Sequence, residues 1–207
     1  MYRMEIIGRA AHPGVDPGMG ANATLAMMEQ IMAIVALARP ACATTVTPTV
    51  AHAGTVLNVV PERAEWGLDV RAHSTEELVR VDAGVREVLA SAPLPSTVID
   101  YVTSPPLPTT ASADLFARAQ RLAARLGLPS LEGVTVGGAS DGNYTAALGV
   151  PTLDGLGAVG DGIHARHEHV AISAMPLRAA LAHAVIVELV EEYRRSPPQP
   201  PVFGVKA

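Results

Sequence analysis

A strand leads directly into a helix start in the sequence VVPERAEWGLDVRAHSTEE, residues 59–77. Apolar and polar residues alternate from Ala64 to Val70, and a period of two is typical of a strand with one buried face. Ser74 is followed three residues later by Glu77, which is the pattern of a capping box at the start of a helix. The stretch therefore predicts a strand and then a helix through Ala90.

The segments on either side complete a regular order of elements. We predict strands at residues 5–12, 44–53, 59–72 and 96–103, and helices at residues 22–37 and 74–90. The order is strand, helix, strand, strand, helix, strand. This order is the ferredoxin-like βαββαβ layout of an α+β fold.

The first of these helices has a clear predicted beginning and end. Asn22 suits the N-cap position, and Pro40 is expected to stop the helix. Its apolar residues recur at helical spacing, which predicts the helix itself. These residues are Leu25, Met28, Ile31, Met32 and Val35.

A proline-dense stretch, SPPLPTT at residues 104–110, reads as a linker between two domains. We place the boundary at residue 107, with a first domain over residues 1–107 and a second over residues 108–195. The proline-rich tail, residues 196–207, is expected to be disordered.

The second domain is predicted to be thin. We expect helices at residues 113–126 and 173–194, a short helix after residue 141, and only two short strands, at residues 132–136 and 151–153. In the last helix Leu177, Leu181, Val185 and Leu189 are expected to be buried. So small a unit buries only about 60% of its chain surface. We therefore expect something else to cover it.

The composition excludes several classes of function. Asp and Glu outnumber Lys and Arg by 20 to 15, so no polybasic stripe is available for nucleic acid or anionic lipid. One cysteine, Cys42, excludes an internal disulfide and a cysteine-rich metal cluster. No charged-then-apolar leader is seen, and the longest apolar run, residues 31–38, is too short to cross a bilayer. We expect a soluble, cytoplasmic protein with no nucleic acid or membrane partner.

Two loops in the second half carry possible chemistry. The loop GIHARHEH, residues 162–169, is the densest histidine cluster, and neutral imidazole is a common zinc ligand. A solvated surface loop has the same composition, and the spacing is not that of the helical His-Glu-x-x-His motif. The turn GGASD, residues 137–141, suits either an anion-binding backbone or an ordinary turn capped by Ser140 or Asp141. Both loops leave two interpretations open.

Three residues of the first half are weaker candidates. His12 ends a predicted strand, Asn58 lies in a predicted turn, and Arg71 stands beside Asp69. A guanidinium can grip a carboxylate with two hydrogen bonds. Each of the three also has an ordinary structural explanation: a strand end, a turn residue and a surface ion pair.

The combination of these signals resembles the di-zinc exopeptidase family, which includes glutamate carboxypeptidase, aminoacylase and succinyl-diaminopimelate desuccinylase. The resemblance extends from Arg3 to about Arg194. It is carried by the segment GRAAHPG at residues 8–14, NVVP at 58–61 with Asp69-x-Arg71, GGASD at 137–141, and DGLG at 154–157 leading to His164 and Glu168.

The resemblance implies an architecture and a partner. Residues 1–107 would be the inserted lid or dimerisation domain, which forms a homodimer, and residues 108–195 the C-terminal part of an α/β zinc-peptidase catalytic domain. The complete enzyme would hold two Zn2+ ions and hydrolyse an amide next to a free carboxylate in a small substrate.

The resemblance also implies roles for individual residues. His12 would stabilise the oxyanion in the partner subunit's site, Asn58 and Arg71 would hold the substrate, and Arg71 would grip its carboxylate. The backbone of Gly137 and Gly138 would line the site. His164 would be the last zinc ligand, supported by Glu168.

The other half of the expected site is missing. The family takes its remaining ligands and its general base from a segment before the lid, with a His-x-Asp motif and a Glu-Glu pair. This chain has no His-x-Asp, and its Glu-Glu pairs lie in the capping box and near the end of the final helix. A catalytic zinc needs about three protein ligands and water. We therefore expect no peptidase activity from this chain alone.

Three hypotheses follow. The chain is part of a hydrolase whose catalytic half lies upstream or in another chain, through truncation, a split gene or a wrongly assigned start. Alternatively, it is a non-catalytic interaction protein that dimerises through the ferredoxin-like domain. A third hypothesis is a binder of small carboxylates that uses Arg71.

Overall fold

The computed structural model describes residues 1–196, and the chain forms two compact units. The first consists of residues 1–106 together with residues 136–139, and the second contains residues 107–135 and the segment from Ser140 onward. The tail predicted to be disordered, residues 196–207, lies outside the described residues except for Ser196.

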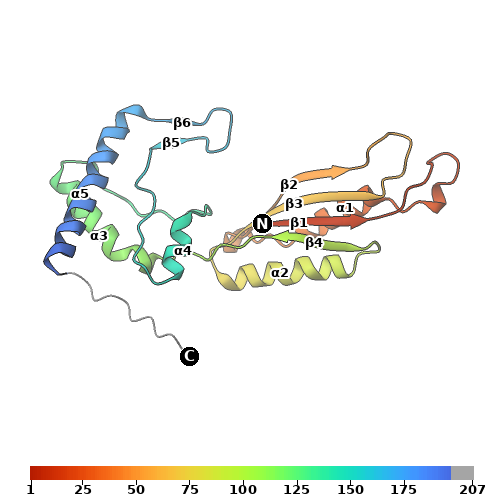
Figure 1. Ribbon diagram of the computed structural model, residues 1–207, viewed down its shortest axis with the longest axis horizontal. Helices are drawn as coiled ribbons and strands as arrows, with labels where there is room; N and C mark the ends of the chain where they lie inside the picture. Colours follow the sequence, from red (N-terminus) through yellow and green to blue (C-terminus); the bar gives the residue numbers. More distant parts are fainter. Residues whose placement is uncertain (197–207) are drawn as a thin grey trace, which may run out of the picture. The chain divides into compact units, whose positions relative to one another are not determined.

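The first unit is a four-stranded antiparallel sheet with two helices on one face (Figure 1). The strands lie in the order β2-β3-β1-β4. Their bounds are β1 Tyr2–Ile7, β2 Thr45–Ala53, β3 Arg63–Arg71 and β4 Ser96–Tyr101, and the helices are α1 Ala23–Val35 and α2 Thr75–Ala90, with short 3-10 turns η1 Pro17–Met19 and η2 Pro40–Cys42. The predicted mixed α/β fold with the βαββαβ order is confirmed.

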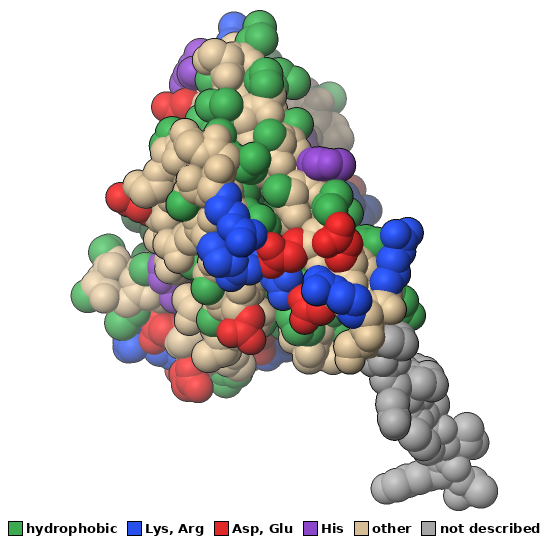
Figure 2. Space-filling model, turned by 90° about the vertical axis from the view of Figure 1, so that its left-hand side faces the viewer, with side chains coloured by type: hydrophobic (Ala, Val, Ile, Leu, Met, Phe, Trp, Pro, Cys, Tyr) green, Lys and Arg blue, Asp and Glu red, His purple; other side chains and the backbone are tan. Residues whose placement is uncertain are grey.

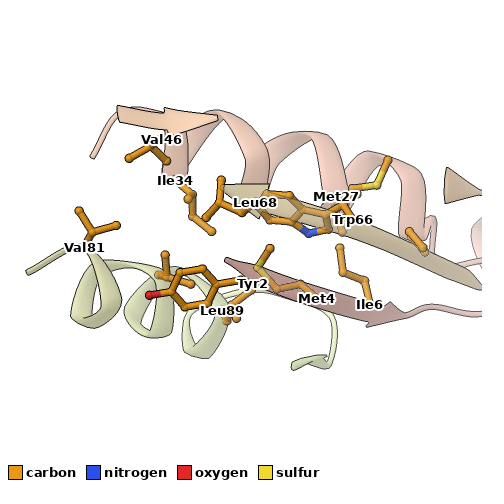
Figure 3. Packing of buried hydrophobic residues seen from close by; sticks show 14 residues of the cluster. Tyr2, Met4, Ile6, Met27, Ile34, Val46, Trp66, Leu68, Val81 and Leu89 are labelled. Carbon is orange, nitrogen blue, oxygen red and sulfur yellow. The ribbon is translucent and has the colours of Figure 1, made fainter. Parts of the chain in front are cut away.

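The core of this unit lies between the sheet and the helices. Met4, Trp66 and Leu68 point from the strands toward the helices, where Ile34 and Val81 meet them (Figure 3). All five side chains are fully buried. The alternation from Ala64 to Val70 therefore sets which face of β3 is inside, as its period predicts.

Both predicted N-caps form. The Asn22 side chain accepts hydrogen bonds from the backbone N–H groups of Thr24 and Leu25, and Ser74 Oγ accepts one from the N–H of Glu77 at 3.2 Å. The Glu77 carboxylate turns away from the cap, because it accepts hydrogen bonds from Arg80 and from Thr44 Oγ1 at 2.8 Å. These hydrogen bonds hold the pKa of Glu77 at about 2.

The apolar residues that predicted helix α1 are divided between its two faces, since Ile31 packs against the core. The helix buries Ala26, Met27 and Ile34, whereas Leu25, Met28 and Met32 face solvent. Because α1 is apolar on both faces, helical spacing alone does not show which face meets the core. The helix ends at Val35, two residues before the predicted end at residue 37.

The strand predicted at residues 5–12 extends too far toward the C-terminus. Strand β1 ends at Ile7, and His12 lies outside it. Gly8 donates to Glu62 O, and Arg9 then pairs with Ala21 in an isolated bridge that takes the chain out of the sheet. A Cβ on Gly8 would lie 2.2 Å from Ala21 O. The glycine is therefore required for this close approach.

The second unit is built on two packed helices. Its elements are α3 Thr109–Arg125, α4 Asp141–Ala147, β5 Gly160–Asp161, β6 His169–Val170, the turn η3 Ile172–Ala174 and α5 Met175–Arg195. Ala119 and Leu122 of α3 pack against Leu181 and Val185 of α5. This core is small, so much of the apolar surface of the unit is uncovered.

Charged side chains join the same two helices. Arg118 pairs with Glu188 at 2.8 Å and with Glu192 at 2.6 Å, and Arg121 pairs with Glu188 at 2.5 Å. Figure 2 shows blue and red side chains gathered on this side of the molecule, with green side chains exposed around them. The pairs fix the α3–α5 contact where apolar packing is thin.

Two predicted strands do not form. Residues 132–136 and 151–153 have no strand structure, and within residues 1–196 they have no neighbouring strand to pair with. A strand needs a hydrogen-bonded partner, so β-favouring sequence is not sufficient by itself. Instead, β5 and β6 form a short antiparallel pair around the histidine-rich loop.

Helix α5 is unusually apolar for so little burial. With η3 it forms a segment, Ile172–Arg195, that is long and apolar enough to match a membrane span by length and composition. Of its predicted inward residues, Leu181 and Val185 are buried, but Leu177 is exposed. A core helix of a domain passes the same test, and α5 packs on α3 through Leu181 and Val185.

Candidate functional site

His12 lies in a tight turn beyond β1. Its backbone N–H donates to Asp16 Oδ1 at 3.2 Å, and its carbonyl accepts from the N–H of Asp16 at 3.1 Å. The backbone N–H of Gly14 donates to His12 Nδ1 at 3.1 Å. Because Nδ1 is an acceptor, the neutral ring carries its proton on Nε2. The exposed imidazole is therefore arranged to donate a hydrogen bond outward.

Asn58 is exposed in the turn between β2 and β3. This turn is held beside the His12 loop, because Val60 N–H donates to Ala11 O at 2.9 Å. Gly20 completes the contact, since a Cβ there would lie 3.0 Å from a Val60 methyl group. His12 and Asn58 thus lie at the same end of the sheet.

Arg71 forms a bidentate ion pair with Asp69 at the end of β3 that lies away from His12 and Asn58. Its Nε and Nη2 donate to the two oxygens of Asp69 at 2.6 Å and 2.8 Å. The hydrogen bonds lower the pKa of Asp69 and raise that of Arg71. The third nitrogen, Nη1, donates to Gly137 O at 3.0 Å. One edge of the guanidinium is therefore already satisfied, and Nη1 is the nitrogen that faces the GGASD turn.

The GGASD turn is a capped helix start. Ser140 Oγ accepts from the N–H of Gly142 at 3.1 Å, and Asn143 Oδ1 accepts from the N–H of Ser140 at 2.9 Å. Ser140 Oγ also donates to Asp154 Oδ2 at 2.7 Å. The carbonyl of Gly137 is used by Arg71, and Gly138 precedes the cap. An anion-binding role for this turn stays a prediction.

His164 is held in a left-handed backbone conformation, with φ of 64°. Such a conformation is uncommon for a residue with a side chain. The turn is fixed by Glu168 Oε2, which accepts from the backbone N–H of His164 at 3.3 Å, and by Ala165 N–H, which donates to Gly162 O at 2.7 Å. Glu168 therefore supports the backbone of His164 rather than its imidazole, which is exposed.

The residues present do not make a zinc site by themselves. No group of three His, Cys, Asp or Glu side chains placed to hold a metal ion occurs within residues 1–196. A catalytic zinc takes about three protein ligands. His164 alone falls short of that number.

Two further residues brace these loops and were not predicted. Asp16 closes the His12 turn from four residues downstream. Arg178, on α5, donates from Nε to Gly157 O at 2.9 Å and from Nη2 to Gly155 O, and so holds the glycine-rich loop. An Asp shortly after a loop histidine is a usable sequence signal, since Asp closes turns. The contact of Arg178 joins residues more than 20 positions apart and has no such local signal.

The candidate residues of the first unit therefore form two separate groups. His12 and Asn58 lie where β3 begins, and Arg71 lies where it ends with Gly137 beside it. Eight residue steps along β3 correspond to about 26 Å at about 3.3 Å per residue. One copy of this unit cannot bring both groups to one small substrate.

Comparison with known proteins defines the class of the first unit. Residues 1–97 match the family described as the peptidase dimerisation domain. This segment includes the four-stranded sheet except for part of β4, both helices, and His12, Asn58 and Arg71. The first unit is therefore a peptidase dimerisation domain.

The remainder of the chain is matched by peptidases as well. Carboxypeptidase G2 of a Pseudomonas strain is 26% identical over 196 residues, which are 90% of this chain and 46% of that protein. The structure of aminopeptidase PepT from Bacillus cereus matches with a TM-score of 0.66 and 26% identity, over 91% of this chain and 51% of that one. A tripeptidase from Staphylococcus aureus shares the fold, with a TM-score of 0.71, 22% identity and the same coverage.

These comparisons confirm the predicted kinship with exopeptidases. The chain is homologous to peptidases of the carboxypeptidase G2 kind, with their dimerisation domain as its first unit. It spans about half the length of the relatives that it matches.

Proposed function

We propose that residues 1–207 supply the dimerisation domain and the C-terminal part of the catalytic domain of a metal-dependent hydrolase that cleaves an amide next to a free carboxylate. The observation that carries this proposal is the coverage: nine-tenths of the chain aligns with less than half of carboxypeptidase G2. The proposed substrate class follows from the resemblance to carboxypeptidases and from the guanidinium of Arg71.

The separation of the candidate residues supports a role for two copies. His12, with Nε2–H directed outward, and Asn58 would approach the site of one subunit from the other. Arg71 and Gly137 would serve the site of their own subunit. His12 would then donate to a developing oxyanion, while Arg71 would orient the substrate carboxylate through Nη1.

A segment that this chain does not contain would complete the second unit. The uncovered apolar side of α5 and the unpaired segments at residues 132–136 and 151–153 are the features that such a segment would cover and pair with. It would also supply the remaining metal ligands and the general base. Two zinc ions are the expectation from the family, and His164 is the ligand that this chain would add.

The proposal predicts that the purified chain is inactive alone. The test is an assay with zinc or cobalt against acyl-amino acids and glutamyl peptides. The expected rate equals the metal-free background, because the described residues provide neither a general base placed beside a metal nor a complete ligand set. Metal-dependent turnover well above background would contradict the proposal.

A second candidate function is a non-catalytic dimerisation protein. The first unit favours this candidate, because it has a large core of its own. The core of the second unit is small. The genomic sequence upstream of Met1, and neighbouring genes, distinguish the two candidates. A His-x-Asp motif and a Glu-Glu pair there favour the hydrolase, and their absence favours the dimerisation protein. A cytoplasmic location is also proposed, on the grounds of the single cysteine, Cys42.

A further inference from the structure

Two loops at one end of the first unit carry exposed apolar side chains. They are the β1–α1 loop and the β2–β3 loop, which lie at the same end of the sheet (Figure 1). Val15 and Met19 of the first loop are 79% and 61% exposed, and Val56 and Leu57 of the second are 56% and 105% exposed. Within the part of the chain that the structure describes, no other large hydrophobic residue is as exposed as Leu57.

The two loops are fixed to each other by backbone contacts. Val60 N–H of the β2–β3 loop donates to Ala11 O of the β1–α1 loop at 2.9 Å. Arg9 and Ala21 close the base of the β1–α1 loop with two backbone hydrogen bonds, each of 2.9 Å. The exposed apolar side chains are therefore held on the same support as His12.

The tips of these loops carry almost no charge. Residues 54–61 contain no Asp, Glu, Lys or Arg. In residues 10–20 the only such residue is Asp16, whose carboxylate accepts a hydrogen bond from the backbone N–H of His12 at 3.2 Å. The first residues of β3 are different, because Arg63 pairs there with Glu65 at 2.9 Å. A molecule that approaches the loop tips therefore meets apolar side chains, an imidazole and an amide.

The chemistry of the proposed reaction shows which part of the substrate faces these loops. In an amide next to a free carboxylate, the carboxylate belongs to the amine part, and the carbonyl belongs to the acyl part. The oxyanion develops on the carbonyl oxygen. A His12 that donates to this oxyanion therefore lies at the acyl part, whereas Arg71 would hold the carboxylate of the amine part. Side chains on the same support as His12 face the acyl group.

We propose that Leu57, with Val56 beside it, is the surface on which the acyl group of the substrate packs, so that the hydrolase selects apolar acyl groups. Leu57 directly precedes Asn58, the proposed substrate contact, and both side chains come from one turn. Packing an alkyl chain on Leu57 removes apolar area of both groups from water, which is favourable. A charged acyl group would lose hydration there and find no charged partner on the loop tips.

The inference rests on the proposed function and adds the class of acyl group. The test uses the complete hydrolase, which is this chain together with the segment that the proposed function requires. Two substrates, N-hexanoyl-glutamate and N-succinyl-glutamate, share the amine part and differ only in the acyl group. We expect a higher kcat/KM for the hexanoyl substrate. Leu57→Ser should lower the ratio of the two kcat/KM values at least about tenfold, because the loss of even one methylene contact changes specificity by about that factor.

A second variant tests for a gain of activity. Leu57→Arg should raise kcat/KM for N-succinyl-glutamate above that of the natural hydrolase, because a guanidinium pairs with the succinyl carboxylate. Damage to the protein cannot produce such a gain. The matched control is Val79→Ser, at a position that is 63% exposed on α2, and it should leave the ratio of the two kcat/KM values unchanged.

The outcomes separate the two proposals. If no segment restores amide hydrolysis, the proposed function is overturned, and this inference with it. An active hydrolase that prefers the succinyl substrate overturns the inference alone. The same conclusion follows if Leu57→Ser lowers kcat/KM equally for both substrates and Leu57→Arg gives no gain, because the loop tip would then contact protein rather than the acyl group.

Discussion

Arg71 illustrates how much a single residue type can and cannot predict. Its role as a carboxylate ligand was expected from the sequence, and the structure shows it already holding Asp69 with two hydrogen bonds. The neighbouring Asp orients the guanidinium and leaves Nη1 directed at Gly137 O. A substrate carboxylate would therefore compete for Nη1 with a neutral carbonyl, which is a weaker partner than a carboxylate.

Glu77 gives a prediction about pH at the same scale. Its pKa of about 2 in the folded chain lies below the value of about 4.3 of a free Glu side chain. Because the folded pKa is depressed, the stabilisation is present above pH 4.3 and is lost as pH falls toward 2. Glu77→Gln should lower the urea midpoint at pH 7 and flatten its decline between pH 5 and pH 2.

The control for this prediction is Glu76→Gln. Glu76 is the preceding residue and forms no ion pair with the part of the chain that the structure describes. Its substitution should leave the pH dependence of the urea midpoint unchanged. Equal curves for the Glu77 variant and the natural chain would show that the ion pairs with Arg80 and Arg39 do not form in solution.

At the scale of elements, helix caps could be predicted from the sequence, whereas the elements that pack or pair with one another could not. Asn22 and Ser74 cap their helices as expected, because a cap depends on neighbours within a few residues. The face of α1 that meets the core did not follow from its spacing, and the strand at residues 132–136 was predicted wrongly. Both features depend on what lies against the element: the sheet in one case, and a pairing strand in the other.

In the candidate site too, local features could be predicted from the sequence and long-range contacts could not. The sequence placed His12, Asn58 and Arg71 in one domain, but it could not show that β3 separates them by its full length. The resemblance implied that Glu168 supports His164 as a metal ligand, and in the structure Glu168 contacts the backbone of His164, whereas the contact of Arg178 with the loop was not expected. Local spacing predicts turns, and only the fold determines which distant segments meet.

The β5–β6 pair gives a prediction about an element. A Cβ on Gly160 would lie 2.0 Å from His169 O, so Gly160→Ala should separate the two strands that hold the His164 loop. Overpacking of this kind costs about 1–3 kcal/mol. The readout is faster hydrogen exchange across residues 160–170 together with a lower unfolding temperature.

Gly157→Ala is the matched substitution in the same glycine-rich segment. A Cβ there meets nothing within 4 Å, and its φ is not in the left-handed region. It should leave exchange in the loop unchanged. If both variants behave alike, the loop is not held by the β5–β6 pair.

At the scale of the whole molecule, the two units differ in completeness. The first has a continuous core, both helix caps and a fold matched by peptidase dimerisation domains. The second has a five-residue core, an apolar helix with little cover and one candidate metal ligand. This difference between the two units is consistent with a chain that covers about half the length of its relatives.

The claim that this chain holds only part of a metal site is tested most directly by zinc titration calorimetry of the natural chain and of His164→Ala. A single histidine in an exposed loop should give binding no tighter than the micromolar range, and the two titrations should be nearly the same, because a tight site needs several ligands. Stoichiometric binding that is tighter than micromolar and is lost in the His164 variant would contradict the account.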